Sequence, residues 1–225
     1  AGFNLISDNS CEIVETGWSK LDRLFTNHPK TKDFKHEKPV VFYAPTFSPK
    51  LTSTKALFQY IEELSKTKEW QWIVKLHPKA TPEDVAMYRN LDSDKLSFIE
   101  TNDIIPLLQA ADIILSDTSS VITEFALQGK PVVTLNNYNP KDWMIDFQEP
   151  DRLESKIELA LQNDANLKTK MKAYIDLIHP AKDGLSSERV LDAIEDLYNR
   201  GLGHLKPKPF NLLRRLKNLR GKNLR

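Results

Sequence analysis

The sequence lacks several features that mark whole classes of proteins. Cys11 is the single cysteine among 225 residues, which excludes an internal disulfide and a cysteine-built zinc site and favours a reducing compartment. No run approaches the roughly 18 consecutive apolar residues of a membrane-spanning helix. The sequence contains neither a Gly-rich dinucleotide fingerprint nor a phosphate-loop motif, which disfavours NAD binding and P-loop NTPase chemistry.

What remains is the composition of an ordinary globular protein. With 40% apolar and 28% charged residues, the chain can bury one sizeable core. We predict a single domain over residues 1–205, with an entry segment at 1–38 and a helical part at 151–200, followed by a tail at 206–225. No charged and apolar leader follows Ala1, so we expect a cytoplasmic chain without a signal peptide that begins as a fragment of a longer protein.

Acidic residues are absent from the tail, which carries eight Lys or Arg and leaves residues 1–205 with a formal charge of −7. A core of that charge argues against nucleic acid as a partner, because nucleic-acid-binding domains spread positive charge over a folded face. Within residues 207–225, Phe210, Leu213, Leu216 and Leu219 alternate with cations. Such a segment can lie on an anionic membrane, at the inner face of the cell membrane for a cytoplasmic protein, or it can be a solvated end.

Short β-branched and aromatic runs alternate with longer helical patterns along the chain. The expected strands are residues 40–44, 72–76, 96–99, 113–116 and 132–135. The expected helices between them are residues 54–65, 81–90, 104–110 and 120–127, followed by 151–162, 166–178 and 186–199. Repeated strand–helix alternation predicts the α/β class, here a Rossmann-like doubly wound parallel sheet with a helical C-terminal extension.

Ligands of such sheets bind beyond the carboxyl ends of the strands, so the residues that follow each strand are the candidate site. Thr46 follows the first strand, His77 the second, and Asp117-Thr118-Ser119-Ser120 the fourth. The last string places three hydroxyls before a helix start, where free amides and the helix dipole favour a phosphate. The alternative is that these residues only cap the helix.

His77 and Lys75 are the candidate basic groups at this edge of the sheet. As an imidazolium His77 could neutralise a phosphate, and as a neutral ring it could act as a general base, although a lone histidine is often structural. Lys75 could contact the same phosphate or a neighbouring carboxylate. Asp92 and Asp94 have the spacing of a chelating pair but lie at the opposite edge of the sheet, so we predict no metal.

Four strings of the sequence resemble the CDP-glycerol glycerophosphotransferase family, whose members build teichoic-acid-type polymers. They occupy residues 42–47, 74–78, 111–120 and 125–132, with further similarity at 16–22 and 183–189. The resemblance implies that the chain is the C-terminal, donor-binding half of a GT-B enzyme. It also implies that His77, Ser119 and Ser120 bind the pyrophosphate of the donor, with Thr118 in place of the usual tyrosine.

By this resemblance the reaction is attack of an acceptor hydroxyl, on a polymer or glycolipid, at the donor phosphorus, with CMP leaving. His77 is the expected catalytic residue, and Lys75, Thr46, Asp117, Thr118, Ser119 and Ser120 are the expected donor-binding residues, with no cofactor beyond the CDP-linked substrate. The base of the family belongs to an N-terminal domain missing from this chain, so we expect binding without turnover. The alternatives are a nucleotide-sugar glycosyltransferase, an enzyme like the UDP-N-acetylglucosamine 2-epimerases, and a non-catalytic nucleotide-binding module.

Overall fold

A computed structural model of the chain describes residues 11–26, 38–162, 164–179, 181–207 and 211–212. It contains two compact units, one formed by Trp18–Leu185 and the other by Ala1–Gly17 with Ser186–Arg225. The sequence predicts one domain over residues 1–205, whereas the structure groups the last long helix with the segment that ends at Gly17. Most of the basic segment 207–225 lies outside the described residues.

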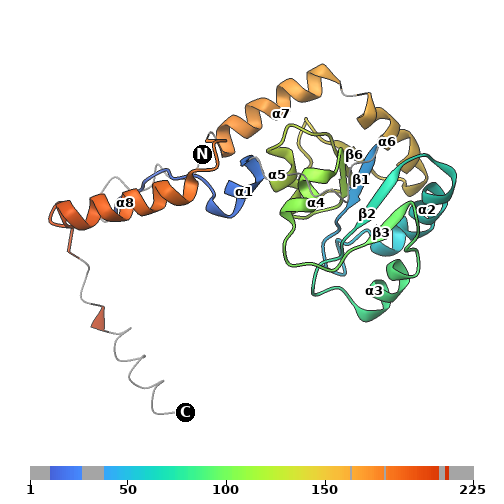
Figure 1. Cartoon of the computed structure of the whole chain (residues 1–225), viewed down its shortest axis with the longest axis horizontal. Coiled ribbons are helices and arrows are strands. Elements are labelled where there is room, and N and C mark those ends of the chain that lie inside the picture. Colours follow the sequence, from blue (N-terminus) through green and yellow to red (C-terminus); the bar gives the residue numbers. More distant parts are fainter. Residues whose placement is uncertain (1–10, 27–37, 163, 180, 208–210, 213–225) are drawn as a thin grey trace, which may run out of the picture. The chain divides into compact units, whose positions relative to one another are not determined.

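The larger unit is built on a six-stranded sheet in which every strand pair is parallel. Figure 1 shows the sheet with its flanking helices, and the strand order is β3-β2-β1-β4-β5-β6. The strands are β1 (Val40–Tyr43), β2 (Gln71–Val74), β3 (Leu96–Phe98), β4 (Ile113–Ser116), β5 (Val132–Leu135) and β6 (Ile145–Phe147). This order is that of a doubly wound dinucleotide-binding sheet, which confirms the expected fold class.

Helices cover both faces of the sheet, as the alternating pattern predicts. In this unit they are α1 (Asp22–Phe25), α2 (Thr54–Thr67), α3 (Pro82–Arg89), α4 (Ile105–Ala110), α5 (Val121–Ala126), α6 (Leu153–Leu161) and α7 (Ala165–Ile178), with short 3-10 turns at Ser19–Leu21 and Pro150–Arg152. Thr81 caps α3 by accepting a hydrogen bond from the amide of Asp84, and Pro82 follows it at the first helical position. These boundary residues satisfy or remove amides that have no partner within the helix.

Two hydrophobic cores lie on opposite faces of the sheet. One packs α4, α5 and the buried side of α7 against one face, and Phe125 and Leu108 are fully buried there. The other packs α2, α3 and α6 against the second face around Trp72 and Tyr88. Alternate side chains of β1 therefore enter different cores, because successive residues of a strand point to opposite faces.

The edge strand β6 is the one strand of the described sheet that the sequence analysis missed. It spans three residues, Ile145–Phe147, and pairs in parallel with β5. Three residues hold too little alternation to be distinguished from a loop. Its central residue Asp146 accepts hydrogen bonds from the Thr134 hydroxyl and the Asn137 amide, so tertiary contacts define the strand.

The smaller unit contains α8 (Ser186–Arg200) and the segment that begins at residue 11. Glu12 binds the Arg200 guanidinium and the ring of His204. The hydrogen bonds from these two groups lower the pKa of Glu12. Among the described residues, no helix has the length and apolar character needed to cross a membrane.

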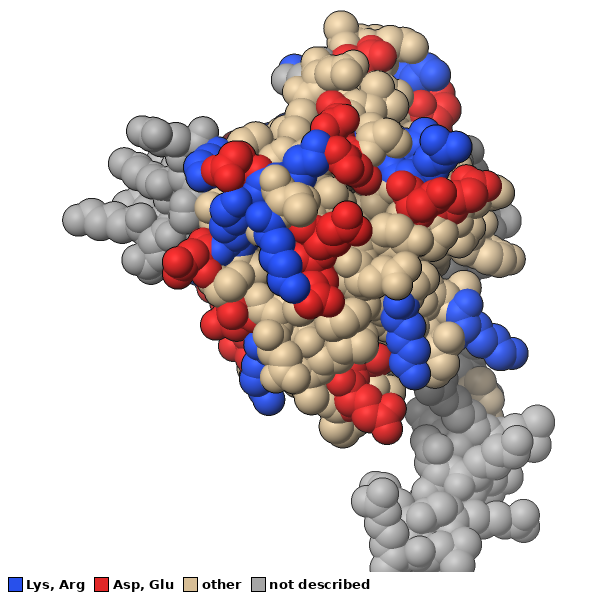
Figure 2. Space-filling model, turned by 90° about the vertical axis from the view of Figure 1, so that its right-hand side faces the viewer, with Lys and Arg blue, Asp and Glu red and all other residues tan. Residues whose placement is uncertain are grey.

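The surface charge of the face drawn in Figure 2 is mixed, because lysine and arginine side chains lie next to acidic ones. Ion pairs of this kind link Lys68 to Glu154 and Glu158, and link Glu69 to Lys38 and Lys95. The hydrogen bonds from the two lysines lower the pKa of Glu69 to about 2. Because these groups are exposed, each pair contributes little to stability.

Candidate functional site

A cavity of about 320 Å³ opens at the carboxyl ends of the strands, where the strand order reverses between β1 and β4. This is the position at which doubly wound sheets bind their ligands. Its lining is Lys20, Ala44, Pro45, Lys75, His77, Pro78, Thr101, Asn102, Ile104, Ser119, Ser120, Val121 and Glu124. The structure therefore brings together four of the side chains singled out in the sequence: Lys75, His77, Ser119 and Ser120.

Asp117 holds the two loops that flank the cavity. One carboxylate oxygen accepts hydrogen bonds from the amides of Thr46 (2.8 Å) and Thr118 (2.6 Å). The other oxygen accepts from the amide (2.8 Å) and hydroxyl (2.9 Å) of Ser53. Because Asp117 follows β4 whereas Thr46 and Ser53 follow β1, this single side chain ties both loops together across the switch point of the sheet.

Three of the expected donor-binding residues do not line the cavity. Asp117 is completely buried and its oxygens are occupied by loop groups. Thr46 turns its amide to Asp117, and the Thr118 hydroxyl accepts a hydrogen bond from the amide of Tyr138. In this structure Thr46, Asp117 and Thr118 shape the loops around the cavity, and their expected contact with the donor stays a prediction.

Ser119 and Ser120 stand at the start of α5 with their hydroxyls available to the cavity. Among the described residues, neither hydroxyl has a hydrogen-bond partner. Helix α5 has six residues, which is shorter than the segment expected from the sequence, so its dipole is a weak source of positive potential. The hydroxyls and nearby cations are the groups that can contact an anion here.

Two lysines supply positive charge to the cavity. Lys75, directly after β2, is half-buried, and no carboxylate pairs with it among the described residues. Burial lowers the pKa of Lys75, and the charge of Lys20 lowers it further. A cation in this environment is destabilised until an anion arrives, because burial penalises the charged form.

His77 lies between this cavity and an adjoining one of about 440 Å³. Its Nδ1 accepts a hydrogen bond from the amide of Lys79 at 3.0 Å. Burial lowers the pKa of His77, and the ammonium groups of Lys75 and Lys79 lower it further. The lowered pKa favours the neutral ring over the imidazolium in the free protein.

Glu124 is a site residue that the sequence analysis missed. Its carboxylate is 5% exposed, and Oε1 accepts a hydrogen bond from Lys20 Nζ at 2.5 Å. Oε2 is buried and has no hydrogen-bond partner among the described residues. The available signal was an acid in an otherwise apolar helical run, four residues after Ser120 and therefore on the same helix face.

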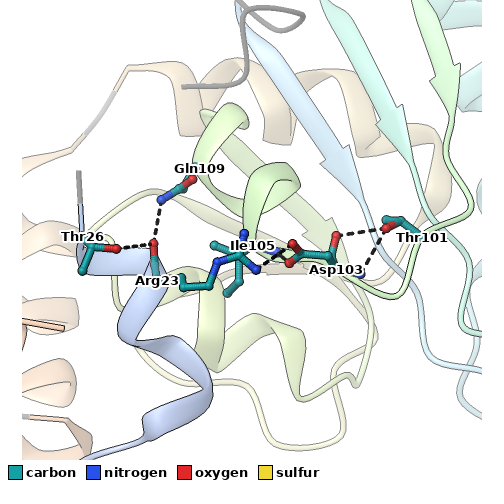
Figure 3. A network of polar contacts seen from close by, with 6 residues as sticks. All are labelled: Arg23, Thr26, Thr101, Asp103, Ile105 and Gln109. Carbon is teal, nitrogen blue, oxygen red and sulfur yellow. Dashed lines mark hydrogen bonds and ion pairs between the residues drawn. The ribbon is translucent and has the colours of Figure 1, made fainter. Parts of the chain in front are cut away.

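A polar network holds the loop of Thr101, which lines the cavity (Figure 3). The Asp103 carboxylate accepts hydrogen bonds from the Arg23 guanidinium at 2.8 Å and from the amide of Ile105 at 3.2 Å. The Thr101 hydroxyl accepts from the amide of Asp103, and Gln109 donates to the carbonyl of Arg23. The network joins α1 to α4, so the turn carrying Lys20 is held against the loop of Thr101.

The remaining candidate sites are weak. No cluster of His, Cys, Asp or Glu among the described residues could hold a metal ion. An apolar cavity beside Trp143 and Met171 measures only about 20 Å³, which is enough for about one water molecule. The cavity at the switch point is therefore the candidate site.

Comparison with known proteins identifies the family to which the chain belongs. The model of CDP-Glycerol:Poly(glycerophosphate) glycerophosphotransferase matches residues 3–196. The chain belongs to this glycerophosphotransferase family. The resemblance seen in the sequence is thereby confirmed, and three of the four strings that carried it, residues 42–47, 74–78 and 111–120, contribute side chains to the lining of the cavity.

Two curated members of this family show how much of a full-length enzyme the chain represents. It is 32% identical to the teichoic acid glycerol-phosphate primase of Bacillus subtilis, over 71% of this chain and 44% of the primase. It is 28% identical to the teichoic acid poly(ribitol-phosphate) polymerase of Bacillus spizizenii, over 77% of this chain and 30% of the polymerase. The chain thus spans less than half the length of these relatives.

Solved structures agree with the GT-B type of fold expected for a glycerophosphotransferase. A CDPG-soaked structure of the wall teichoic acid polymerase TagF matches with a TM-score of 0.60 at 16% identity, covering 84% of this chain and 53% of that one. The UDP co-structure of MnaA from S. aureus matches with a TM-score of 0.57 at 19% identity, covering 88% and 57%. At such low identities the likeness establishes the fold, and the expected Rossmann-like GT-B domain is confirmed.

Proposed function

We propose that this chain is the donor-binding half of a transferase that moves glycerol phosphate, or a related polyol phosphate, from a CDP-activated donor to an acceptor hydroxyl in cell-surface polymer synthesis. The observation that carries the proposal is the cavity in which Lys75, His77 and two unpaired serine hydroxyls converge. Membership of the family supports the reaction class. The names of the two curated relatives leave glycerol phosphate and ribitol phosphate as the candidate groups transferred.

The side chains that line the cavity are of the kinds that bind a diphosphate ester. Lys75 is half-buried without a carboxylate partner in the described chain, and Lys20 reaches the same space. Ser119, Ser120 and the Nε2–H of neutral His77 can donate hydrogen bonds to phosphate oxygens. The amide of Asn102 and the hydroxyl of Thr101, also on the lining, can accept hydrogen bonds from hydroxyls of the donor.

Transfer by in-line attack depends mainly on positioning and on neutralising the charge of the leaving phosphate. As the acceptor oxygen bonds to the glycerol-bearing phosphorus, the bond to the bridging oxygen breaks and CMP leaves with the added charge. Lys75 and His77 stabilise that charge in the cavity, so His77 acts as a hydrogen-bond donor to the substrate. No described residue of the cavity is placed as a base for the acceptor hydroxyl, so turnover requires a group from the rest of a full-length enzyme.

The acceptor belongs to the same proposal. A polymer or glycolipid with a free hydroxyl is the acceptor class, and the enzyme acts at the inner face of the cell membrane. The basic segment 207–225 is the proposed contact with anionic lipid, and its cations supply the attraction. A matched pair of proteins, with and without residues 207–225, tests this in sedimentation with vesicles of anionic lipid, and equal binding of the two proteins would remove the contact.

Calorimetric titration of the chain tests the donor. CDP-glycerol and CMP are expected to bind more tightly than UDP and UDP-N-acetylglucosamine. Comparing the affinities for CDP-glycerol and CDP-ribitol shows which of the two polyol phosphates the cavity prefers. The Ser119→Ala variant should bind about tenfold more weakly, because a hydrogen bond to a charged group is lost. Ser97→Ala is the matched control, since Ser97 is exposed on β3 away from the cavity. Preference for the uridine compounds would move the assignment to a nucleotide-sugar enzyme such as an epimerase.

A further inference from the structure

The ring of Phe47 packs against the ring of His77, a residue that lines the cavity. Their centroids are 4.3 Å apart and the planes are inclined by 32°. Phe47 belongs to the loop after β1, whereas His77 belongs to the loop after β2. The contact therefore joins neighbouring strand ends and does not belong to either hydrophobic core.

Phe47 is 42% exposed, which is a high exposure for a phenylalanine that touches a candidate site. Its described ring contacts are His77 and the ammonium of Lys79, which lies 5.3 Å from the ring centroid. Burial in the core therefore does not explain the orientation of Phe47. The aromatic ring instead contacts two neighbours, a tilted imidazole and a cation attracted by the ring quadrupole.

The second contact of His77 determines its tautomer. The amide of Lys79 can only donate, and it points at Nδ1 at 3.0 Å. Nδ1 must therefore carry the lone pair, and the proton of the neutral ring lies on Nε2. If Nδ1 were protonated, its N–H would face the N–H of the Lys79 amide, and the two donors would repel each other. The amide therefore also disfavours the doubly protonated imidazolium.

We propose that Phe47 is a positioning residue for His77: its ring and the Lys79 amide together hold the imidazole in the Nε2–H tautomer, with that proton directed to the phosphate of the ligand. The inference rests on the proposed function for the identity of the ligand. It assigns His77 the role of a neutral donor, not that of a base, and gives Phe47 a role that its exposed position would not otherwise indicate.

The charged groups around the ring agree with a neutral imidazole. The charges of Lys75, at the end of β2, and of Lys79, in the following turn, both act on it, and Lys20 lines the same cavity. The two acids on the lining are Glu124, which is paired with Lys20, and Glu100, which lies on the wall of the adjoining cavity. Neither is paired with His77 among the described residues, so the cations outweigh the acids.

The test uses the full chain with ¹⁵N-labelled histidine and the variants Phe47→Ala, Phe47→Tyr, His77→Ala and Phe47→Ala/His77→Ala. Nitrogen NMR of the free protein near pH 7 should report the Nε2–H tautomer at His77 in the wild type and in Phe47→Tyr. Phe47→Ala should show a mixture of tautomers, because without the phenyl ring the imidazole can turn away from the Lys79 amide. CDP-glycerol affinity should fall about tenfold in His77→Ala and threefold to tenfold in Phe47→Ala, since an aligned hydrogen bond to a charged group is weakened.

The double variant separates positioning from direct contact. If Phe47 acts through His77, adding Phe47→Ala to His77→Ala should change the affinity by less than about twofold, because coupled residues are not additive. A full additional loss would mean that Phe47 touches the ligand itself and would overturn the inference. Failure of the wild type to bind CDP-glycerol would refute the proposed function, and the tautomer of the free protein would still decide the role of Phe47. An unchanged tautomer in Phe47→Ala would refute that role.

Discussion

Replacing Asp117 with Asn should destabilise the fold without acting through the ligand. The carboxylate is fully buried and accepts four hydrogen bonds, from the amides of Thr46, Ser53 and Thr118 and from the Ser53 hydroxyl. An asparagine has the same shape but presents one oxygen and one NH₂ group. If its oxygen keeps the amides of Thr46 and Thr118, its NH₂ faces the amide of Ser53, and a donor then meets a donor.

The magnitude follows from those contacts. A hydrogen bond to an ionised acceptor contributes about 1.5–3 kcal/mol, and an unsatisfied buried donor costs about 1–3 kcal/mol. Asp117→Asn forfeits the bond to the Ser53 amide and weakens the two amide bonds that remain, so we expect a loss of about 3 kcal/mol. In a unit of this size that loss lowers the melting temperature by roughly 6–12 °C. Asp117→Ala, which leaves all the donors unsatisfied, should lose about 5 kcal/mol.

Urea unfolding followed by tryptophan fluorescence measures the effect, and Ser119→Ala serves as the control because its hydroxyl has no partner in the described chain. The free energy of unfolding of the control should lie within about 0.5 kcal/mol of the wild-type value. If Asp117→Asn is as stable as the wild type while CDP-glycerol binding is lost, the carboxylate contacts the ligand directly. That result would refute the positioning role and restore the expectation drawn from the sequence.

Four further outcomes follow from individual contacts. Lys130→Met should lose about 1–2 kcal/mol in urea unfolding, because the ammonium donates to three carbonyls at the end of α4 that have no helical partner. Lys75→Met should raise the melting temperature while weakening CDP-glycerol binding, because burial lowers the pKa of this lysine and penalises its charge. Lys20→Met should lower the free energy of unfolding by about 1 kcal/mol, because it leaves the Glu124 carboxylate unpaired, and adding Glu124→Gln should restore most of the lost stability. The lowered pKa of His77 means that the unfolded chain takes up its proton first, so stability should fall as the pH drops below about 6.5, and less so in His77→Asn.

Much of the larger unit could be predicted from the sequence because its signals are local. The strand of residues 113–116 and that of residues 132–135 were expected with the bounds that β4 and β5 have. The apolar runs are continuous because a parallel strand is buried on both faces. The rule that ligands bind at the carboxyl ends then directed attention to His77 and Ser119 before any contact was known.

The contacts that the sequence did not indicate depend on tertiary structure. Asp117 and Thr118 occupy the loop expected to bind phosphate, but their polar groups bind Ser53, Thr46 and Tyr138, which are distant in sequence. The Lys20–Glu124 pair joins residues 104 positions apart. Residue type and periodicity do not reveal contacts between residues so far apart in the sequence. The sequence therefore located the loop, but it did not show which of its residues line the cavity and which support the loop.

The charge distribution of the cavity gives an independent argument for an anionic ligand. Lys75 lacks a carboxylate partner in the described chain, burial and the neighbouring lysines lower the pKa of His77, and the one buried acid on the lining is engaged by Lys20. Such an arrangement is unfavourable in the free protein, because a half-buried cation keeps its charge at a cost. A phosphate that enters the cavity removes this penalty by pairing with Lys75. Groups held in this way bind more tightly than equally charged groups on the open surface, because water screens them less and they need not reorganise when the ligand arrives.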